Sequence, residues 1–216
     1  MSSISSVDSK IDLAPVASAL EEVASGDQLT RGKALIEAFL EDVNGDEFAV
    51  HSPAEWAAIT VGLLEFVQQR KPGKAKVDLV DLAGSGRDKR SALRIVTDDM
   101  AFIVDSVNIV FGRAQLEVRV LQHPIVRVQR DAQGRLLSLA RRHSDHEGSD
   151  EAVIYCEIRR VAGEKDRARL IESIQSVLAD VRVTVEDWAP MRERMLAIAD
   201  EFPDRSLPLD EEGVRE

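Results

Sequence analysis

The first third of the chain has the periodicity of helices. From Ile11 to about Arg70, apolar residues recur three or four positions apart, as they do on one face of an α-helix. One such stripe contains Leu29, Leu35, Ile36, Phe39 and Leu40, and it predicts a helix that ends near Asn44 and Gly45. We therefore expect a helical lobe at this end of the chain.

The next helix start has a clearer signature. In the segment Ser52-Pro53-Ala54-Glu55, Ser occupies the N-cap position, Pro the first helical position and Glu the third position after the cap. This is a capping box, in which the Ser and Glu side chains each bind a backbone amide of the first turn. The pattern predicts a helix from here to the break at Lys71-Pro72-Gly73.

After Gly73 the apolar period changes from helical spacing to alternation, which favours strands. The pattern predicts strands at 77–82, 93–97, 116–120, 126–129, 136–140 and 153–159, with a short last one at 181–185. It predicts helices at 103–111, closed by Gly112, at 164–180, and in a final segment that runs to Phe202 around Trp188. The turn at 130–135 joins two of these strands as a hairpin.

This order of elements predicts an α+β fold. From about Arg90 to Val185 it corresponds to a ferredoxin-like βαββαβ unit, in which two helices cover one face of a mainly antiparallel sheet. The other face then needs a cover, either the helical lobe or a second copy of the chain. We divide the chain into a flexible N-terminus at 1–10, the helical lobe at 11–72, the α+β domain at 73–185, and a C-terminal helix with an acidic tail at 186–216.

Composition excludes several classes of function. The chain has 216 residues and a net charge of −11, which repels nucleic-acid phosphates and anionic lipid surfaces. No apolar run approaches the roughly 20 residues of a membrane-spanning helix, and no secretory leader is visible. Cys156 is the single cysteine, so no internal disulfide forms. We expect a cytoplasmic protein that binds neither nucleic acid nor membrane.

The charge is distributed unevenly along the chain. Residues 1–66, 67–142 and 143–216 carry net charges of −9, +7 and −9. Unlike surfaces attract, so the basic middle section is expected to face at least one acidic flank. Exposed arginines on strands of the middle section explain the same numbers equally well.

Three segments invite a chemical interpretation, and each has a simpler explanation. Gly84-Ser85-Gly86 follows a strand but lacks the third glycine and the helix of a dinucleotide loop, so we interpret it as a turn. His143, Asp145, His146 and Glu147 offer metal ligands, yet they lie in a polar loop predicted from Arg141 to Glu151, without a second cluster. Cys156 is expected on the apolar face of its strand, where a thiol is inert.

The segment around Asp98 and Asp99 is the most informative. A strand end, two carboxylates and a helix start meet here, so that either Asp is placed to cap amides of the first turn. The alternative is a site for a small polar ligand, such as an amino acid. Spacing alone leaves both interpretations open.

Several motifs together resemble a known family. The run Val96-Thr-Asp-Asp-Met-Ala-Phe-Ile-Val-Asp-Ser-Val107 resembles the DDMPFLVDS signature of the large bacterial NAD-specific glutamate dehydrogenases. Agreement continues at 70–73, 123–128, 130–136, 180–182 and 185–188. The resemblance spans roughly residues 60 to 200 and implies an ACT-like domain of βαββαβ order.

The resemblance also implies a function. It makes this chain an N-terminal regulatory or oligomerisation segment of an enzyme that converts L-glutamate and NAD to 2-oxoglutarate, ammonium and NADH. This segment then holds no catalytic residue, cofactor or metal, and NAD binds elsewhere in the parent. The alternatives are a stand-alone ACT-like module that binds a small molecule, and a metal-dependent enzyme that uses His143 and His146.

The implied ligand loop consists of Asp98, Asp99, Met100, Ala101, Phe102 and Asp105. Ala101 replaces the usual Pro of the signature, and Phe102 stands where a ligand-binding ACT domain generally has Gly. A side chain there hinders close approach of a ligand to the backbone, which favours packing or oligomerisation over binding of an amino-acid effector.

The expected partners are the rest of the parent chain and further copies of this one. We expect the copies to associate through the sheet, because helices on one face leave strand edges or the second face open. The strands between Leu116 and Arg130 are the predicted contact, with outward Glu117, Arg119, Arg127 and Arg130.

Overall fold

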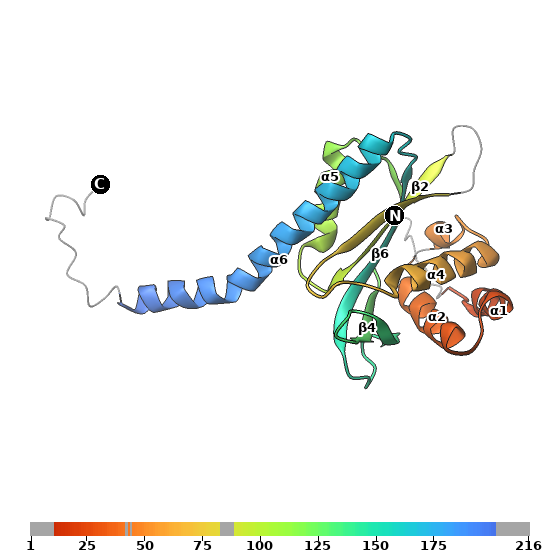
Figure 1. The fold of residues 1–216 in the computed structure, drawn as a ribbon, viewed down its shortest axis with the longest axis horizontal. Coiled ribbons are helices and arrows are strands. Elements are labelled where there is room, and N and C mark those ends of the chain that lie inside the picture. The colour runs from red at the N-terminus through yellow and green to blue at the C-terminus, as the bar shows by residue number, and fades with distance from the viewer. Residues whose placement is uncertain (1–10, 42, 44, 83–88, 202–216) are drawn as a thin grey trace, which may run out of the picture.

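The computed structural model describes residues 11–41, 43, 45–82 and 89–201 (Figure 1). The expected turn at 84–86, the expected flexible N-terminus at 1–10, Asn44, and the predicted helix end at Phe202 with the acidic tail after it lie outside these residues. The protein is a mixed α+β fold with N-terminal helices, a six-stranded antiparallel sheet and a long C-terminal helix.

The helical lobe is confirmed. Its helices are α1 (Ala14–Val23), α2 (Gly26–Phe39), α3 (Gly45–Phe48) and α4 (Pro53–Val67). The capping box at the start of α4 is present: the Glu55 amide donates to Ser52 Oγ at 3.3 Å, and the Ser52 amide donates to Glu55 Oε2 at 2.8 Å. Trp56 follows it and is fully buried, so the cap fixes the helix where it anchors the lobe's core.

The sheet is antiparallel throughout its described pairings. Its strands are β1 (Lys76–Asp81), β2 (Arg90–Asp98), β3 (Val118–Gln122), β4 (Ile125–Arg130), β5 (Leu136–Arg141) and β6 (Ser149–Arg159). They lie in the order β1-β2-β6-β4-β5, with β3 also paired to β6. The predicted hairpin is therefore confirmed as β4–β5. Strand β6 begins inside the segment that sequence assigned to a loop.

One predicted strand is wrong. The two C-terminal helices α5 (Ile103–Arg113) and α6 (Glu164–Glu201) follow β2 and β6, but α6 continues through Val181–Val185 and past Pro190. Val181 is buried on the same helical face as Ile174 and Leu178, so tertiary packing outweighs the β preference of its branched side chain. The edge position beside β2 is occupied by β1 instead.

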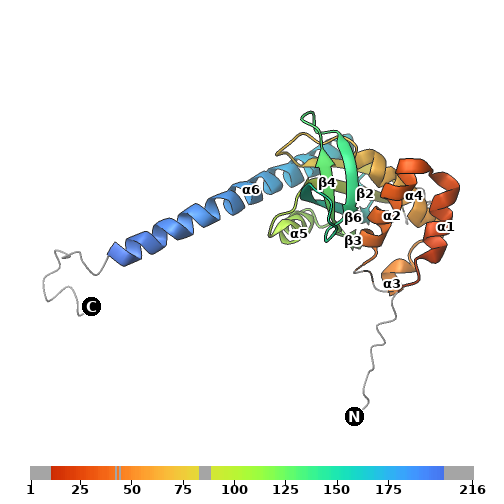
Figure 2. The same ribbon diagram turned by 90° about the horizontal axis from the view of Figure 1, so that it is seen from below.

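The two faces of the sheet have separate cores. On one face, side chains of α2 and α4 pack with residues of the sheet that include Ala92, Val96 and Tyr155. On the other face, α5 and α6 pack on residues that include Leu93, Ile95 and Ile154. Figures 1 and 2 show the lobe and α6 on opposite sides of the sheet. The helical lobe thus supplies the cover that the second face requires.

Helix α6 extends well beyond the sheet. Its first half packs beside α5, and the remainder runs away from the rest of the protein in both views (Figures 1 and 2). Every residue from Glu186 to Asp200 is exposed. Within the described residues, no helix combines the length and apolarity that crossing a membrane requires.

Candidate functional site

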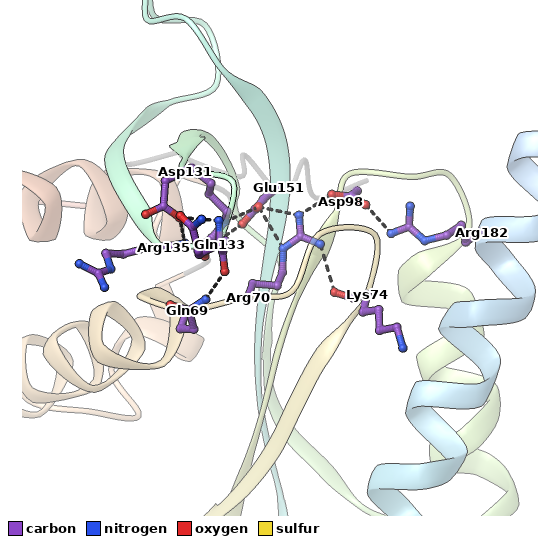
Figure 3. A network of polar contacts seen from close by, with 11 residues as sticks. Gln69, Arg70, Lys74, Asp98, Asp131, Gln133, Arg135, Glu151 and Arg182 are labelled. Carbon is purple, nitrogen blue, oxygen red and sulfur yellow. Dashed lines mark hydrogen bonds and ion pairs between the residues drawn. The ribbon is translucent and has the colours of Figure 1, made fainter.

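Arg70 lies at the centre of a polar network that joins all three layers. Arg70 follows α4 and is only 4% exposed. Its Nε and Nη2 donate to Glu151 Oε1 at 3.0 and 2.7 Å, and Nη1 donates to the Lys74 carbonyl at 3.1 Å (Figure 3). Each of its three guanidinium nitrogens therefore has an acceptor.

Glu151 is the shared acceptor of this network and is fully buried on β6. In addition to Arg70, Arg130 of β4 donates from Nε to Oε1 at 2.7 Å and from Nη2 to Oε2 at 2.8 Å. Two arginines on one buried carboxylate compensate for its removal from water. Arg130 therefore points inward and is paired, and its predicted place on an outward, self-associating surface is wrong.

Asp98 extends the network to α6. It ends β2, accepts from Arg70 Nη2 at 2.5 Å through Oδ1, and accepts from Arg182 Nη2 through Oδ2 (Figure 3). Burial alone disfavours the carboxylate, but the hydrogen bonds and charges of Arg70 and then Arg182 outweigh it. The pKa of Asp98 consequently lies below its ordinary value.

The surroundings of Arg70 also stabilise its charged form. Burial works against the guanidinium, but the charge of Glu151 and the hydrogen bonds to Asp98 and Glu151 outweigh it, so that the pKa of Arg70 is raised. The shifts in the pKa of Arg70 and of Asp98 both favour the charged forms of this ion pair. We call Arg70, Asp98, Arg130, Glu151 and Arg182 the joint, because their contacts connect the end of α4, the sheet and α6.

The β4–β5 turn closes over this joint. Gly134 has φ +81°, and its carbonyl accepts from the Arg70 amide and from Arg130 Nη1, each at 3.0 Å. A Cβ at Gly134 would lie 1.9 Å from the Arg70 carbonyl oxygen. Only glycine permits both the left-handed backbone and this close approach.

The predicted ligand loop is divided between different roles. Asp98 belongs to the network, whereas Asp99 pairs with Arg142 at 2.9 Å and its amide donates to the Asp150 carbonyl at 3.0 Å. Met100 is partly buried against the core beneath α5 and α6. Ala101 and Asp105 are exposed.

The capping role predicted for Asp98 or Asp99 is wrong. The N-cap of α5 is Phe102, with φ 67° and no side-chain hydrogen bond, because the helix starts only at Ile103. Phe102 is 65% exposed in a backbone conformation that favours glycine. The segment therefore forms a turn whose first carboxylate serves the arginines.

The remaining chemical candidates stay apart from this network. His143, Asp145, His146 and Glu147 are all exposed, and no group of three possible metal ligands occurs among the described residues. Cys156 is fully buried on the apolar face, as predicted, and burial raises the pKa of its thiol to about 12.

Sequence reasoning missed Glu151 and Arg182. Glu151 appeared only as the end of a polar loop, although it directly precedes the apolar run 152–156, where a carboxylate needs a partner. Arg182 was assigned to the strand that does not form. The cross-block charge pattern was the available signal, since Arg70 and Arg130 of the basic section pair with Glu151 of the acidic C-terminal section.

Comparison with known proteins identifies the family. The model of the glutamate dehydrogenase ACT1 domain matches residues 35–174. The chain belongs to this family. The match extends from within α2 to the first half of α6, so it includes the sheet and the carboxylates of the joint.

Curated relatives agree with this assignment. An NAD-specific glutamate dehydrogenase of Pseudomonas aeruginosa is 33% identical over 105 residues, which are 48% of this chain and 6% of that protein. One of Halomonas elongata is 28% identical over 147 residues, 66% of this chain and 9% of that protein. The chain thus spans less than a tenth of the length of either relative. No solved structure matches it.

The motifs of the family resemblance meet in the joint. Arg70, Asp98, Arg130 and Arg182 come from four of the resembling segments, at 70–73, 96–107, 130–136 and 180–182. Gly134 belongs to the third of these. Segments far apart in the sequence therefore contribute to one network, which is centred on the buried Arg70 and Glu151.

Proposed function

We propose that this ACT1-family chain is a regulatory or assembly segment of an NAD-dependent glutamate dehydrogenase. In this proposal the parent enzyme oxidises L-glutamate with NAD to 2-oxoglutarate and ammonium. The segment supplies no catalytic residue, and NAD binds elsewhere in the parent. The family match and the names of both relatives support this assignment.

The fold is interpreted as a rearranged ACT-like unit. The first five elements of a βαββαβ unit correspond to β2, α5, β3 with β4, β6 and α6. Here β3 and β4 together count as the second strand, and β5 is an addition. Within the described residues, which end at 201, no strand follows α6 to complete that unit. Strand β1 lies antiparallel to β2 at the edge and takes its place.

The observation that carries the assembly role is an apolar stripe on the projecting half of α6. We define the α6 stripe as Trp188, Met191, Met195 and Ile198, which are 63, 55, 69 and 40% exposed. Their spacing of three, four and three residues continues that of Ile174, Val177 and Val181 in the same helix, which are buried except for the partly buried Val177. Such alternating spacing is the seam of a coiled coil.

The occupant in this proposal is a second copy of α6, running antiparallel. The body of the protein lies at one end of α6 only, so an antiparallel pair keeps the two bodies apart (Figure 2). Asp187 and Arg194 directly precede Trp188 and Met195 of the stripe. An antiparallel pair brings Asp187 of each copy beside Arg194 of the other.

This contact replaces the sheet contact expected from sequence. Both faces of the sheet are already covered, and Arg127 pairs with Asp150 at 3.3 Å. Only strand edges remain, whereas α6 offers large apolar side chains in solvent. A helix without tertiary contacts is only marginally stable in water, whatever the helix propensity of its residues. Packing of the α6 stripe is therefore the main source of stability for the projecting half.

Analytical ultracentrifugation of this chain tests the proposal. Wild type should sediment as a reversible dimer, and Met191→Glu should shift it to monomer by placing a carboxylate in the seam. Val183→Glu is the matched control, because Val183 is 56% exposed on α6 but lies outside the stripe. A monomeric wild type at all concentrations, or equal effects of both substitutions, would contradict the proposal.

A further inference from the structure

A second polar site lies between the helical lobe and the other end of β6. It is a hollow of about 400 Å³ whose lining includes His51, Glu55, Arg90, Arg119, Tyr155 and Glu157. Its volume is at the small end of the range for ligand sites. None of these residues takes part in the Arg70 joint.

The base of the hollow is a buried carboxylate with two partners. Glu157 is 1% exposed, and its Oε1 accepts from the Tyr155 hydroxyl at 2.9 Å and contacts His51 Nε2. Burial, followed by the charge of Glu157, raises the pKa of Tyr155, so its hydroxyl stays protonated and donates. Both of these contacts use Oε1, and no described residue donates to Oε2, which is therefore the oxygen offered to a further donor.

Arg90 brings a positive charge to the hollow, and two of its nitrogens are buried without an acceptor among the described residues. Among the described residues, no acceptor lies within hydrogen-bond distance of its buried Nε and Nη1. Alternation along β2 places Arg90 on the same face as Ala92, which is opposite Glu157 in the β2–β6 register. A guanidinium remains charged when buried, and leaving its buried donors unpaired is unfavourable.

The charges of Arg90 and Glu157 indicate which groups a ligand of the hollow carries. We propose that this hollow binds a small metabolite whose carboxylate pairs with Arg90 and whose ammonium or hydroxyl group donates to Glu157. A carboxylate matches the two parallel N–H donors of a guanidinium, and a donor at the other end uses the open lone pairs of the base. Arg119 and Glu55 also line the hollow, are exposed at its mouth and carry the same two charges.

This inference goes beyond the proposed assembly function and does not depend on it. The ligand site lies on the lobe side of the sheet, whereas α6 lies on the other side. It also differs from the predicted ligand loop, whose Asp98 is already engaged by Arg70 and Arg182.

Four three-carbon probes test the ligand chemistry by NMR titration of this chain. Propionate carries the anion alone and propylamine the cation alone, while L-alanine and L-lactate carry a carboxylate with an ammonium or a hydroxyl donor. We expect at least one of the last two to bind about tenfold more tightly than either single-group probe, with the largest shifts at amides lining the hollow. The preferred one identifies the donor as ammonium or hydroxyl.

Substitutions locate the binding in the hollow. Arg90→Gln should weaken the preferred probe at least about tenfold, since a charge-assisted pair is lost. Arg127→Gln, on β4 and away from the hollow, is the matched control and should leave binding unchanged. Arg119→Gln, at the exposed mouth, gives a second readout if Arg90→Gln does not fold, and should weaken binding by a smaller factor.

Two results would overturn the inference. One is the absence of saturable binding by all four probes. The other is binding of L-alanine or L-lactate that Arg90→Gln, or Arg119→Gln in its place, leaves unchanged.

Discussion

Arg182 of α6 donates to Asp98 at the end of β2, and Asp98 accepts from Arg70 through its other oxygen. Asp98 thus links the long helix to the residue that follows the helical lobe. Arg182 is placed where α6 leaves the body, immediately after the buried Val181. The ion pair therefore fixes the direction in which the α6 stripe projects.

Loss of the shared acceptor should strongly destabilise the fold. Glu151→Gln leaves Arg70 and Arg130 facing a neutral group in a buried site, so the free energy of unfolding should fall by about 3–5 kcal/mol. Urea denaturation followed by circular dichroism measures this. Glu147→Gln, in the exposed loop just before β6, is the control and should change stability by less than about 0.5 kcal/mol.

The stability should depend on acid through Asp98. Because the folded-state pKa of Asp98 is lowered, its contribution is fully present above its unfolded pKa of about 3.9 and is lost as pH falls through the folded value. The difference in unfolding free energy between wild type and Asp98→Asn should be constant above about pH 5 and shrink below about pH 4. An unchanged difference down to pH 2 would contradict the assignment of the charge.

Gly134 should tolerate no side chain. Gly134→Ala combines a left-handed backbone with a Cβ that meets the Arg70 carbonyl, and it should cost more than about 2 kcal/mol of unfolding free energy. Gly73→Ala is the matched control, because Gly73 has φ +68° but open space around its Cβ position. That substitution should cost only about 1 kcal/mol, from the backbone conformation alone. Thermal denaturation of both variants provides the comparison, and equal costs would mean that the close approach is unimportant.

Local signals in the sequence predicted most of the secondary structure. The capping box placed the start of α4 at Pro53, and alternation located the strands of the sheet. These predictions succeed because each depends on residues a few positions apart. Val181–Val185 failed for the opposite reason: its β-branched residues suit a strand, and only contacts with distant parts of the body keep it helical.

The contacts of the joint could not be predicted from local sequence patterns. Its members lie at positions 70, 98, 130, 151 and 182, and nothing local distinguishes a paired arginine from an exposed one. The signature contains Asp98, which the structure places in the joint. Its interpretation as a cap failed because the partners of Asp98 come from α6 and from the residue after the lobe.

Cross-linking between copies of α6 tests the central claim most directly. Met191→Cys places a thiol in the stripe near the midpoint of the proposed antiparallel pair, and native Cys156 is buried and unreactive. A short bismaleimide should join two copies of Met191→Cys, and the product should run as a covalent dimer under denaturing conditions. Glu193→Cys, on the outer side of the same helix, should remain a monomer. Equal cross-linking at both positions, or none at Met191→Cys, would contradict self-association through the α6 stripe.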